Sequence, residues 1–213
     1  MRSDRRIKGL LETYGTVRDA IRERLREFDE VKRCGPLRVY EELVFCLLTP
    51  QSRSKAADKA VKRLKEAGVL LKGDRREVAL VLRECGVRFH NVKARYVVLS
   101  RELLNDIEAF NRLLEGDPRE VRERLVERVK GFGYKEASHF LRNVGIVDLA
   151  ILDRHVLRCL KSTGVIRSVP RTLTRKRYLT IESKFLDLSR ELGLKPAELD
   201  LLLWYIRTGE VFK

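Results

Sequence analysis

The residues best suited to chemistry on a charged strand lie between positions 129 and 138. Gly131 and Gly133 bracket one apolar residue, and Lys135 follows where a helix pattern begins. Glycine adopts a positive φ without steric cost and lets another backbone come close. The free N–H groups at the start of the next helix form an anion site suited to a phosphate. The segment therefore offers both a means of holding DNA and an amine that could attack it.

Asp153, one helix further along the chain, could complete this chemistry. An amine nucleophile must be uncharged, whereas free lysine has a pKa of about 10.4, which burial and nearby positive charge lower. A neighbouring carboxylate can take the proton, orient the amine and stabilise a positive, sugar-like transition state. The alternative is that Lys135 contacts a phosphate and Asp153 caps a helix. The residues alone leave both interpretations open.

The charge balance predicts a polyanionic partner. The 213 residues include 46 Lys and Arg against 31 Asp and Glu, a formal net charge of +15. Such an excess favours nucleic acid through steering and counterion release. A solvated thermophile surface also explains many charges, but not their imbalance in sign. No acidic residue occurs between positions 154 and 181, whereas basic residues stand at Arg154, Arg158, Lys161, Arg167, Arg171, Arg175, Lys176 and Arg177.

The cysteines and histidines predict no metal centre built from side chains. The four cysteines are scattered, without the spacing of a zinc ribbon or an iron–sulfur cluster. We expect Cys46 and Cys159, which lie in apolar helical runs, to be buried free thiols. His139 and His155 lack a third ligand, so structural hydrogen bonding is expected. No signal peptide and no apolar run of about 20 residues is visible, which favours a cytoplasmic protein without a membrane span.

The hydrophobic periodicity predicts an all-α fold. We expect one or two helices over residues 7–28, a core helix over 40–48, a helix capped by Ser52 or Ser54, and a long helix over 93–105. Asp117 and Pro118 start a helix that ends near position 128. A second helix over 135–144 follows the glycine hairpin. This layout is that of a helix–hairpin–helix DNA-backbone module.

From this pattern we predict two helical domains with the active-site cleft between them. One domain comprises residues 1–32 and 145–213, from both chain ends. The other comprises residues 33–144 and ends in the helix–hairpin–helix at about 118–144.

The motifs of residues 131–135, 136–143 and 152–155 resemble the helix–hairpin–helix glycosylase superfamily, in which the lysine after the hairpin and the downstream aspartate are the catalytic pair. The run from Lys135 to Asn143, with Trp204 and the terminal Lys213, is similar to the archaeal-type 8-oxoguanine DNA glycosylase/AP lyases. Endonuclease III relatives usually carry four clustered cysteines near the C-terminus. Their absence here favours the oxoguanine branch and predicts no iron–sulfur cluster.

The resemblance implies a bifunctional enzyme of base-excision repair. The damaged nucleotide is extruded from the duplex, because its sugar carbon is unreachable inside the stack. Lys135 then attacks C1′ and displaces the base with help from Asp153, and the resulting Schiff base permits β-elimination. The resemblance also implies a monovalent cation held by backbone carbonyls of residues 129–133, with no other cofactor.

The residues that would read the damaged base are expected near the C-terminus. By resemblance, Trp204 stacks on the flipped base, although core packing is the alternative for a lone tryptophan. Phe89 could form the other side of the sandwich. Lys213 helps to read the oxidised base in the family. Asp200 could accept a hydrogen bond from the base edge, or it could cap the last helix.

Further residues are expected to contact the duplex. Gln51, in the loop of residues 49–52, could fill the hole left by the extruded base, or it could be an ordinary exposed loop residue. His90 is a second candidate contact. The remaining candidates for DNA binding are Gly131, Gly133, Tyr134 and Arg154.

We therefore predict an enzyme that acts as a monomer on double-stranded DNA containing oxidised guanine, in the cytoplasm of a prokaryotic thermophile. One alternative is a glycosylase of the same superfamily for another lesion, similar to endonuclease III. Another is a non-catalytic helix–hairpin–helix DNA-binding protein.

Overall fold

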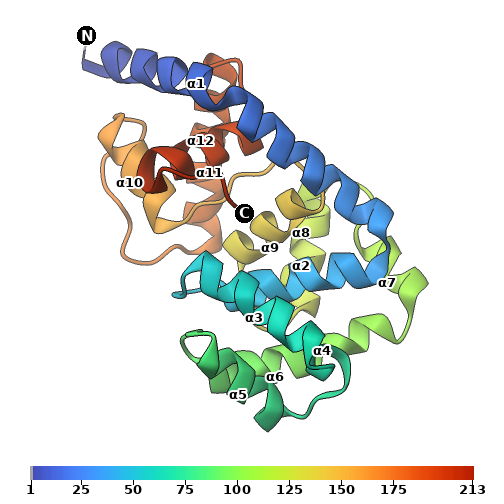
Figure 1. Ribbon diagram of the computed structural model, residues 1–213. Helices are drawn as coiled ribbons and strands as arrows, with labels where there is room; N and C mark the ends of the chain where they lie inside the picture. Colours follow the sequence, from blue (N-terminus) through green and yellow to red (C-terminus); the bar gives the residue numbers. More distant parts are fainter. Residues whose placement is uncertain (1) are drawn as a thin grey trace. The chain divides into compact units, whose positions relative to one another are not determined.

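The computed structural model describes residues 2–213, with side chains from Lys8 onward, and all regular secondary structure in that range is helical (Figure 1). Two 3₁₀ helices, η1 (Lys32–Cys34) and η2 (Arg101–Leu104), accompany the α-helices. The α-helices are α1 (Arg2–Val31), α2 (Pro36–Leu48), α3 (Ser54–Glu66), α4 (Val69–Lys72), α5 (Arg75–Glu84), α6 (His90–Ser100), α7 (Ile107–Leu113), α8 (Pro118–Arg128), α9 (Tyr134–Asn143), α10 (Arg154–Ser162), α11 (Arg175–Glu191) and α12 (Pro196–Thr208).

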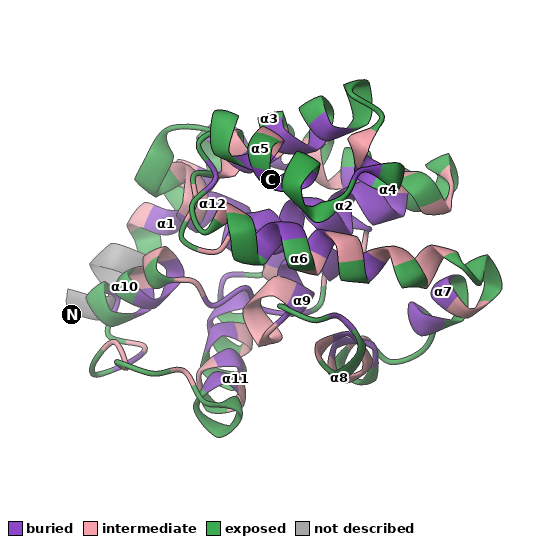
Figure 2. Cartoon of the chain, turned by 90° about the horizontal axis from the view of Figure 1, so that it is seen from below, coloured by how far each residue is buried: buried purple, intermediate pink, exposed green. Residues whose placement is uncertain are grey.

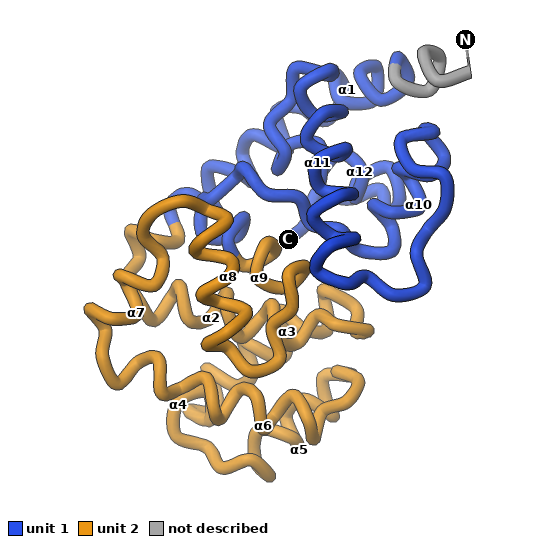
Figure 3. Tube along the Cα trace, turned by 180° about the vertical axis from the view of Figure 1, so that it is seen from behind, with its two compact units in different colours: residues 1–30, 141–213 blue, residues 31–140 orange. Residues whose placement is uncertain are grey.

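The chain divides into two compact units (Figure 3). Unit 1 comprises Met1–Glu30 and Leu141–Lys213, and unit 2 comprises Val31–Phe140. These boundaries differ from the predicted ones by a few residues, chiefly at the end of α9. Arg142 explains this difference, because its guanidinium group binds the Asp200 carboxylate and lies 5.1 Å from the Phe28 ring centroid. Both partners belong to unit 1, so the last residues of α9 belong there too.

Helix α2 is the core element of unit 2, as the apolar run predicted. Its residues from Val39 to Leu48 are all buried, as Figure 2 shows in purple. Helices α3, α6 and α7 pack against it. The run includes two glutamates, and each carries a cationic partner: Lys65 Nζ lies 2.7 Å from Glu41 Oε1, and Arg38 Nη2 lies 2.6 Å from Glu42 Oε1. Pairing is what allows carboxylates to be buried in such a core.

Unit 1 joins the two ends of the chain through α1, α10, α11 and α12. Helix α12 contacts both α10 and α11. The Tyr14 hydroxyl of α1 donates a 2.6 Å hydrogen bond to Glu198 Oε1 near the start of α12. The other oxygen of Glu198 accepts from the Lys195 backbone N–H at 2.8 Å and so caps α12. Glu198 thus both starts α12 and ties it to α1.

The helix–hairpin–helix region of unit 2 is stabilised by a fully buried arginine. Arg122 of α8 donates from Nη1 to Ser138 Oγ of α9 at 3.2 Å, and its guanidinium carbon lies 5.0 Å from the Tyr134 ring centroid. The Tyr134 hydroxyl in turn donates to the Glu123 carboxylate. Between the helices, Phe132 is buried with its ring centroid 6.1 Å from that of Phe140. The two helices and the hairpin therefore form one packed structure.

Residues 7–28, predicted to form one or two helices, belong to the single helix α1. Two other predictions need correction. The helix predicted over 93–105 is α6, which ends at Ser100 and is followed by η2. The prediction that Ser52 or Ser54 caps α3 was wrong, because Arg53 occupies the cap without a side-chain bond. The Ser52 hydroxyl instead accepts hydrogen bonds from Arg88 N and Lys93 Nζ.

Among the helices of the described residues, none has the length and apolar character needed to cross a bilayer.

The hairpin geometry generates a first prediction. Gly131 has φ +100°, and a Cβ placed there would lie 2.4 Å from Tyr96 Cδ2. Gly131→Ala should therefore combine backbone strain with a steric clash and lower the free energy of unfolding by about 2 kcal/mol or more. Gly116→Ala is the matched control, since Gly116 shares φ +100° but its Cβ would meet only Arg124 Nη2 at 3.8 Å. Equal melting temperatures for the two variants would contradict the close approach to Tyr96.

Candidate active site

Lys135 lies in the first turn of α9, directly after the glycine hairpin of unit 2. Its side chain is 23% exposed, and its Nζ lies 3.5 Å from Thr49 Oγ1 and 3.5 Å from Glu136 Oε1. The other oxygen of Glu136 accepts the Gly133 backbone N–H at 3.2 Å, which satisfies one of the free donors at the start of the helix. The amine thus sits half-buried between a hydroxyl and a carboxylate that is already anchored.

Lys93 is a second lysine near this amine, and it was not among the predicted site residues. Its side chain is buried, and Nζ donates to Leu48 O and Pro50 O at 2.7 Å and to Ser52 Oγ at 2.9 Å. Burial lowers the pKa of Lys93 to about 8, and the charges of Lys135 and Arg88 act in the same direction. The sequence does contain a signal for its burial. Lys93 lies on the same helix face as Val97 and Ser100, both of which are buried.

The predicted DNA-contacting residues Gln51 and Phe89 have unusual backbone conformations. Their φ angles are +55° and +57°, and in the described part of the chain no other non-glycine residue has a positive φ. Such conformations cost about 1 kcal/mol or more each and persist where the surroundings enforce them. Here the Arg88 backbone N–H donates to Ser52 Oγ at 3.0 Å and joins the two loops.

These two loops present side chains to solvent. Gln51 is exposed, and Phe89 is 52% exposed with the Arg88 guanidinium carbon 5.6 Å from its ring centroid. His90, half-buried, is the first residue of α6. The structure thus joins the loop that carries Gln51 to the segment that carries Phe89 and leads into His90 of α6. Lys93 donates hydrogen bonds to the first of these loops.

Asp153 in unit 1 caps α10, as one of the two interpretations proposed. Its Oδ1 accepts the backbone N–H groups of His155 and Val156, both at 2.8 Å. Both bonds use the same oxygen, so capping engages one half of the carboxylate. Burial raises the pKa of the half-buried Cys159 thiol, and the Asp153 charge raises it further. The prediction of a buried thiol is confirmed for Cys46 and wrong for Cys159, which is half-buried.

Trp204 lies beside the capped start of α10 rather than in the core. Its ring centroid is 5.9 Å from that of His155, with the two planes at 83°. Trp204 and the terminal Lys213 are both half-buried, and Arg154 is exposed. Unit 1 therefore assembles the predicted stacking residue next to the helix that Asp153 caps.

Asp200 forms an ion pair that the sequence did not predict. It is buried, and its carboxylate is paired with the Arg142 guanidinium group. The same guanidinium group donates from Nε and Nη2 to Asn143 Oδ1 at 3.2 and 3.0 Å. The sequence indicates base recognition or helix capping for Asp200, but it does not reveal this partner. Nothing in the local pattern relates two residues that stand 58 positions apart.

The basic residues between positions 154 and 177 form an exposed surface of unit 1. All eight of these arginine and lysine side chains are exposed.

Within the described residues, no cluster of histidine, cysteine, aspartate or glutamate could hold a metal ion. His139 packs edge-on against Phe45 in unit 2 at 5.6 Å between ring centroids.

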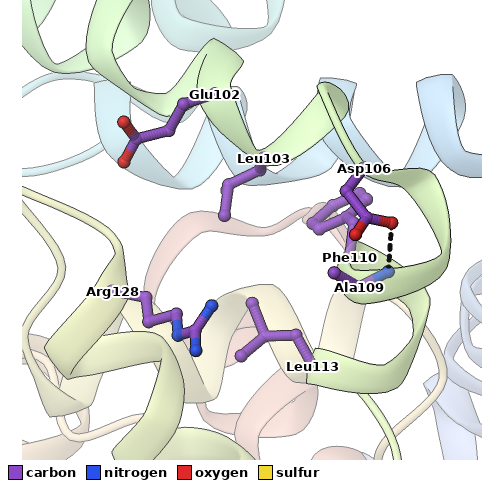
Figure 4. A pocket seen from close by; sticks show the side chains of 7 residues that line it. All are labelled: Glu102, Leu103, Asp106, Ala109, Phe110, Leu113 and Arg128. Atoms are coloured by element: carbon purple, nitrogen blue, oxygen red, sulfur yellow. Dashed lines mark hydrogen bonds between the residues drawn. The ribbon is translucent and has the colours of Figure 1, made fainter.

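A pocket in unit 2 lies apart from these residues. It has a volume of about 390 Å³ and is formed by η2, α7 and the end of α8, with Glu102, Asp106 and Arg128 among its charged residues (Figure 4). Its lining includes none of the predicted site residues.

The glycine hairpin, the lysine in the helix start and the capping aspartate that follows define the helix–hairpin–helix class of DNA glycosylases. The family model described as 8-oxoguanine DNA glycosylase matches residues 21–194. The chain belongs to this 8-oxoguanine DNA glycosylase family.

Proteins of similar sequence and structure match almost the whole chain. An 8-oxoguanine DNA glycosylase/AP lyase of Methanocaldococcus jannaschii is 40% identical over 200 residues, which cover 92% of this chain and 93% of that protein. The structure of the 8-oxoguanine DNA glycosylase of Thermotoga maritima matches with a TM-score of 0.91 and 36% identity over 99% and 100% of the two chains. The Methanocaldococcus jannaschii enzyme in complex with a 15mer DNA containing 8-oxoguanine matches with a TM-score of 0.87 and 36% identity, over 96% and 99%.

The ion pair of Asp200 generates a second prediction. Asp200→Ala should leave the Arg142 charge buried without its partner and lower the free energy of unfolding by about 3–5 kcal/mol, measured by urea denaturation. The double variant Arg142→Met with Asp200→Ala should recover much of that loss. A single variant that unfolds like the wild type but no longer separates 8-oxoguanine from guanine would instead support base recognition by Asp200.

Proposed function

We propose that this chain is a base-excision repair enzyme, a bifunctional 8-oxoguanine DNA glycosylase with AP lyase activity. The observation that carries the proposal is the family match across the chain, combined with a half-buried Lys135 amine at the start of the helix that follows the glycine hairpin. A helix start that binds phosphate would hold the strand beside the amine.

Lys135 is the proposed nucleophile. Its nitrogen forms a bond to C1′ of the extruded nucleotide as the bond from C1′ to the base breaks, and the departing base takes up a proton. The amine then loses its two protons, one of which goes to O4′ as the C1′–O4′ bond breaks and the Schiff base forms. Loss of a proton from C2′ then eliminates the 3′ phosphate. The Glu136 carboxylate, 3.5 Å from Lys135 Nζ, is an acceptor within unit 2 that can orient the amine.

Asp153 is the proposed partner of Lys135 in base release. Its carboxylate would stabilise the positive charge that develops on the sugar. Capping of α10 engages Oδ1 and holds the carboxylate in one orientation. The structural and the catalytic interpretations are therefore compatible, because the cap positions the group that the chemistry needs.

The remaining site residues are proposed to bind the base and the duplex. Trp204 would stack on the extruded base, with Phe89 on the other face, and Lys213 would help to read the oxidised edge. Gln51 would occupy the space that the base leaves. Other contacts to the duplex would come from His90, Gly131, Gly133, Tyr134 and Arg154.

The hairpin is the proposed binding site of a monovalent cation. No other cofactor is proposed. Val129 O accepts the Phe132 N–H at 3.0 Å and Gly133 O accepts the Ala137 N–H at 3.0 Å. Each carbonyl oxygen retains a second lone pair, and carbonyl oxygens are suited to monovalent cations. A bound cation would add positive charge beside a DNA phosphate.

The proposed substrate is double-stranded DNA containing oxidised guanine, bound by a monomer in the cytoplasm of a prokaryotic thermophile. The formal charge of +15 and the exposed basic residues of unit 1 support a DNA partner. Cleavage assays with one defined lesion per duplex would distinguish oxidised guanine from the lesions of endonuclease III relatives.

The role of Lys135 generates a third prediction. Borohydride should trap a covalent adduct between the protein and a duplex carrying 8-oxoguanine, because reduction fixes the Schiff base. Lys135→Gln should abolish this adduct and retain DNA binding. Lys59→Gln, at an exposed position of α3, is the control and should form the adduct normally. A wild type that binds DNA but forms no adduct would indicate a non-catalytic binding protein.

The role of Asp153 generates a fourth prediction. Asn also caps helices well, so Asp153→Asn should keep α10 and DNA affinity close to wild type. Base release should slow by about a hundredfold or more, because the carboxylate charge is lost. Single-turnover excision and DNA affinity, measured together, test this. Full turnover with a large loss of affinity would contradict the proposed role.

A further inference from the structure

The turn between α2 and α3 is contacted by two lysines that come from different helices. Lys93 of α6 donates to Leu48 O, Pro50 O and Ser52 Oγ, and Lys135 of α9 places its Nζ 3.5 Å from Thr49 Oγ1. Both amines therefore contact one segment of five residues, 48–52. The position of Thr49 relative to Lys135 depends on how firmly that segment is held.

Lys93 has no capacity left to bind a substrate. An ammonium group has three donors, and all three are used within the protein. Its side chain is also buried. A direct part in the reaction is excluded by this geometry, so any effect of Lys93 on catalysis acts through the groups around it.

We propose that Lys93 is a positioning residue for the reaction of Lys135. Its ammonium group fixes the turn so that the Thr49 hydroxyl lies beside the Lys135 amine. This inference rests on the proposed function, because it takes Lys135 as the nucleophile.

The charge state of Lys93 decides how many of these contacts it can make. Burial lowers the pKa of Lys93 to about 8, the charges of Lys135 and Arg88 lower it too, and the charge of Glu136 opposes them. At neutral pH Lys93 therefore keeps its charge and all three donors. An uncharged amine has only two donors, so the loss of a proton above about pH 8 removes one of the three hydrogen bonds to the turn.

The turn itself gives Lys93 a second effect. Gln51 lies between the two contacts of Lys93 with Pro50 and Ser52, in a left-handed conformation that an untethered turn would relax. The Ser52 hydroxyl also accepts the Arg88 backbone N–H, next to Phe89. One buried ammonium group thus holds both the hydroxyl beside Lys135 and the loop that carries Gln51.

The test compares Lys93→Met with the wild type by the rate of borohydride trapping on a duplex with a preformed AP site, from about pH 6 to about pH 10. At neutral pH the variant should be slower by about tenfold or more. The deficit should shrink above about pH 8, where Lys93 of the wild type loses its charge and with it one of its three donors to the turn. Lys59→Met on the exposed face of α3 is the matched control and should follow the wild type.

Ser52→Ala keeps the charge of Lys93 but removes one of its three acceptors. This variant should trap about threefold more slowly, with the pH profile of the wild type, because Lys93 loses one of its three hydrogen bonds and the Arg88 backbone N–H loses its bond to the same hydroxyl. It also tests the proposal if Lys93→Met fails to fold. Trapping by Ser52→Ala at the wild-type rate would then overturn the positioning role.

Other outcomes distinguish this inference from the proposed function. A wild type without adduct would overturn the proposed function itself. An adduct formed equally fast by the wild type and a folded Lys93→Met at every pH would overturn only the inference. A deficit of constant size across the pH range would also overturn it, because a purely structural defect does not depend on titration.

Discussion

A single buried ammonium group, that of Lys93, holds the turn between α2 and α3 against α6. Burying a charge without compensation is unfavourable, and here three hydrogen bonds within the protein compensate it. One acceptor, Leu48 O, is the last main-chain carbonyl of α2, where a helix leaves such groups unsatisfied and where positive charge is favourable. The contact therefore satisfies the helix end and helps to compensate the buried charge of Lys93.

Much of the candidate site in unit 2 depends on this arrangement. The turn carries Thr49, which contacts the Lys135 amine, and Gln51, which adopts a left-handed backbone conformation. Ser52 connects the turn to the segment before α6, where Phe89 adopts the second such conformation. Strained residues persist only where their surroundings enforce them. The hydrogen bonds to Lys93 and Ser52 provide this enforcement.

In unit 1 a carboxylate serves structure and proposed chemistry together. One oxygen of Asp153 accepts hydrogen bonds from two backbone N–H groups at the start of α10, and these bonds orient its carboxylate. Asp200 shows the contrasting case, since its carboxylate is buried against the Arg142 guanidinium group, which lies 5.1 Å from the Phe28 ring centroid. Two acidic residues of the same unit thus differ in their surroundings, because Asp153 is half-buried at a helix start and Asp200 is buried in an ion pair.

The local sequence pattern by itself determined where most helices lie, where the glycine hairpin lies and that Lys135 follows it. Helix periodicity and the conformational freedom of glycine act over only a few residues, so they can be recognised in the sequence. It also indicated Asp153 as a cap. Only the tertiary structure decided that Lys93 is buried beside Lys135, that Asp200 pairs with Arg142, and that Ser52 joins two loops instead of capping α3. These contacts join residues 36 to 58 positions apart, and no local preference selects a partner over such a separation.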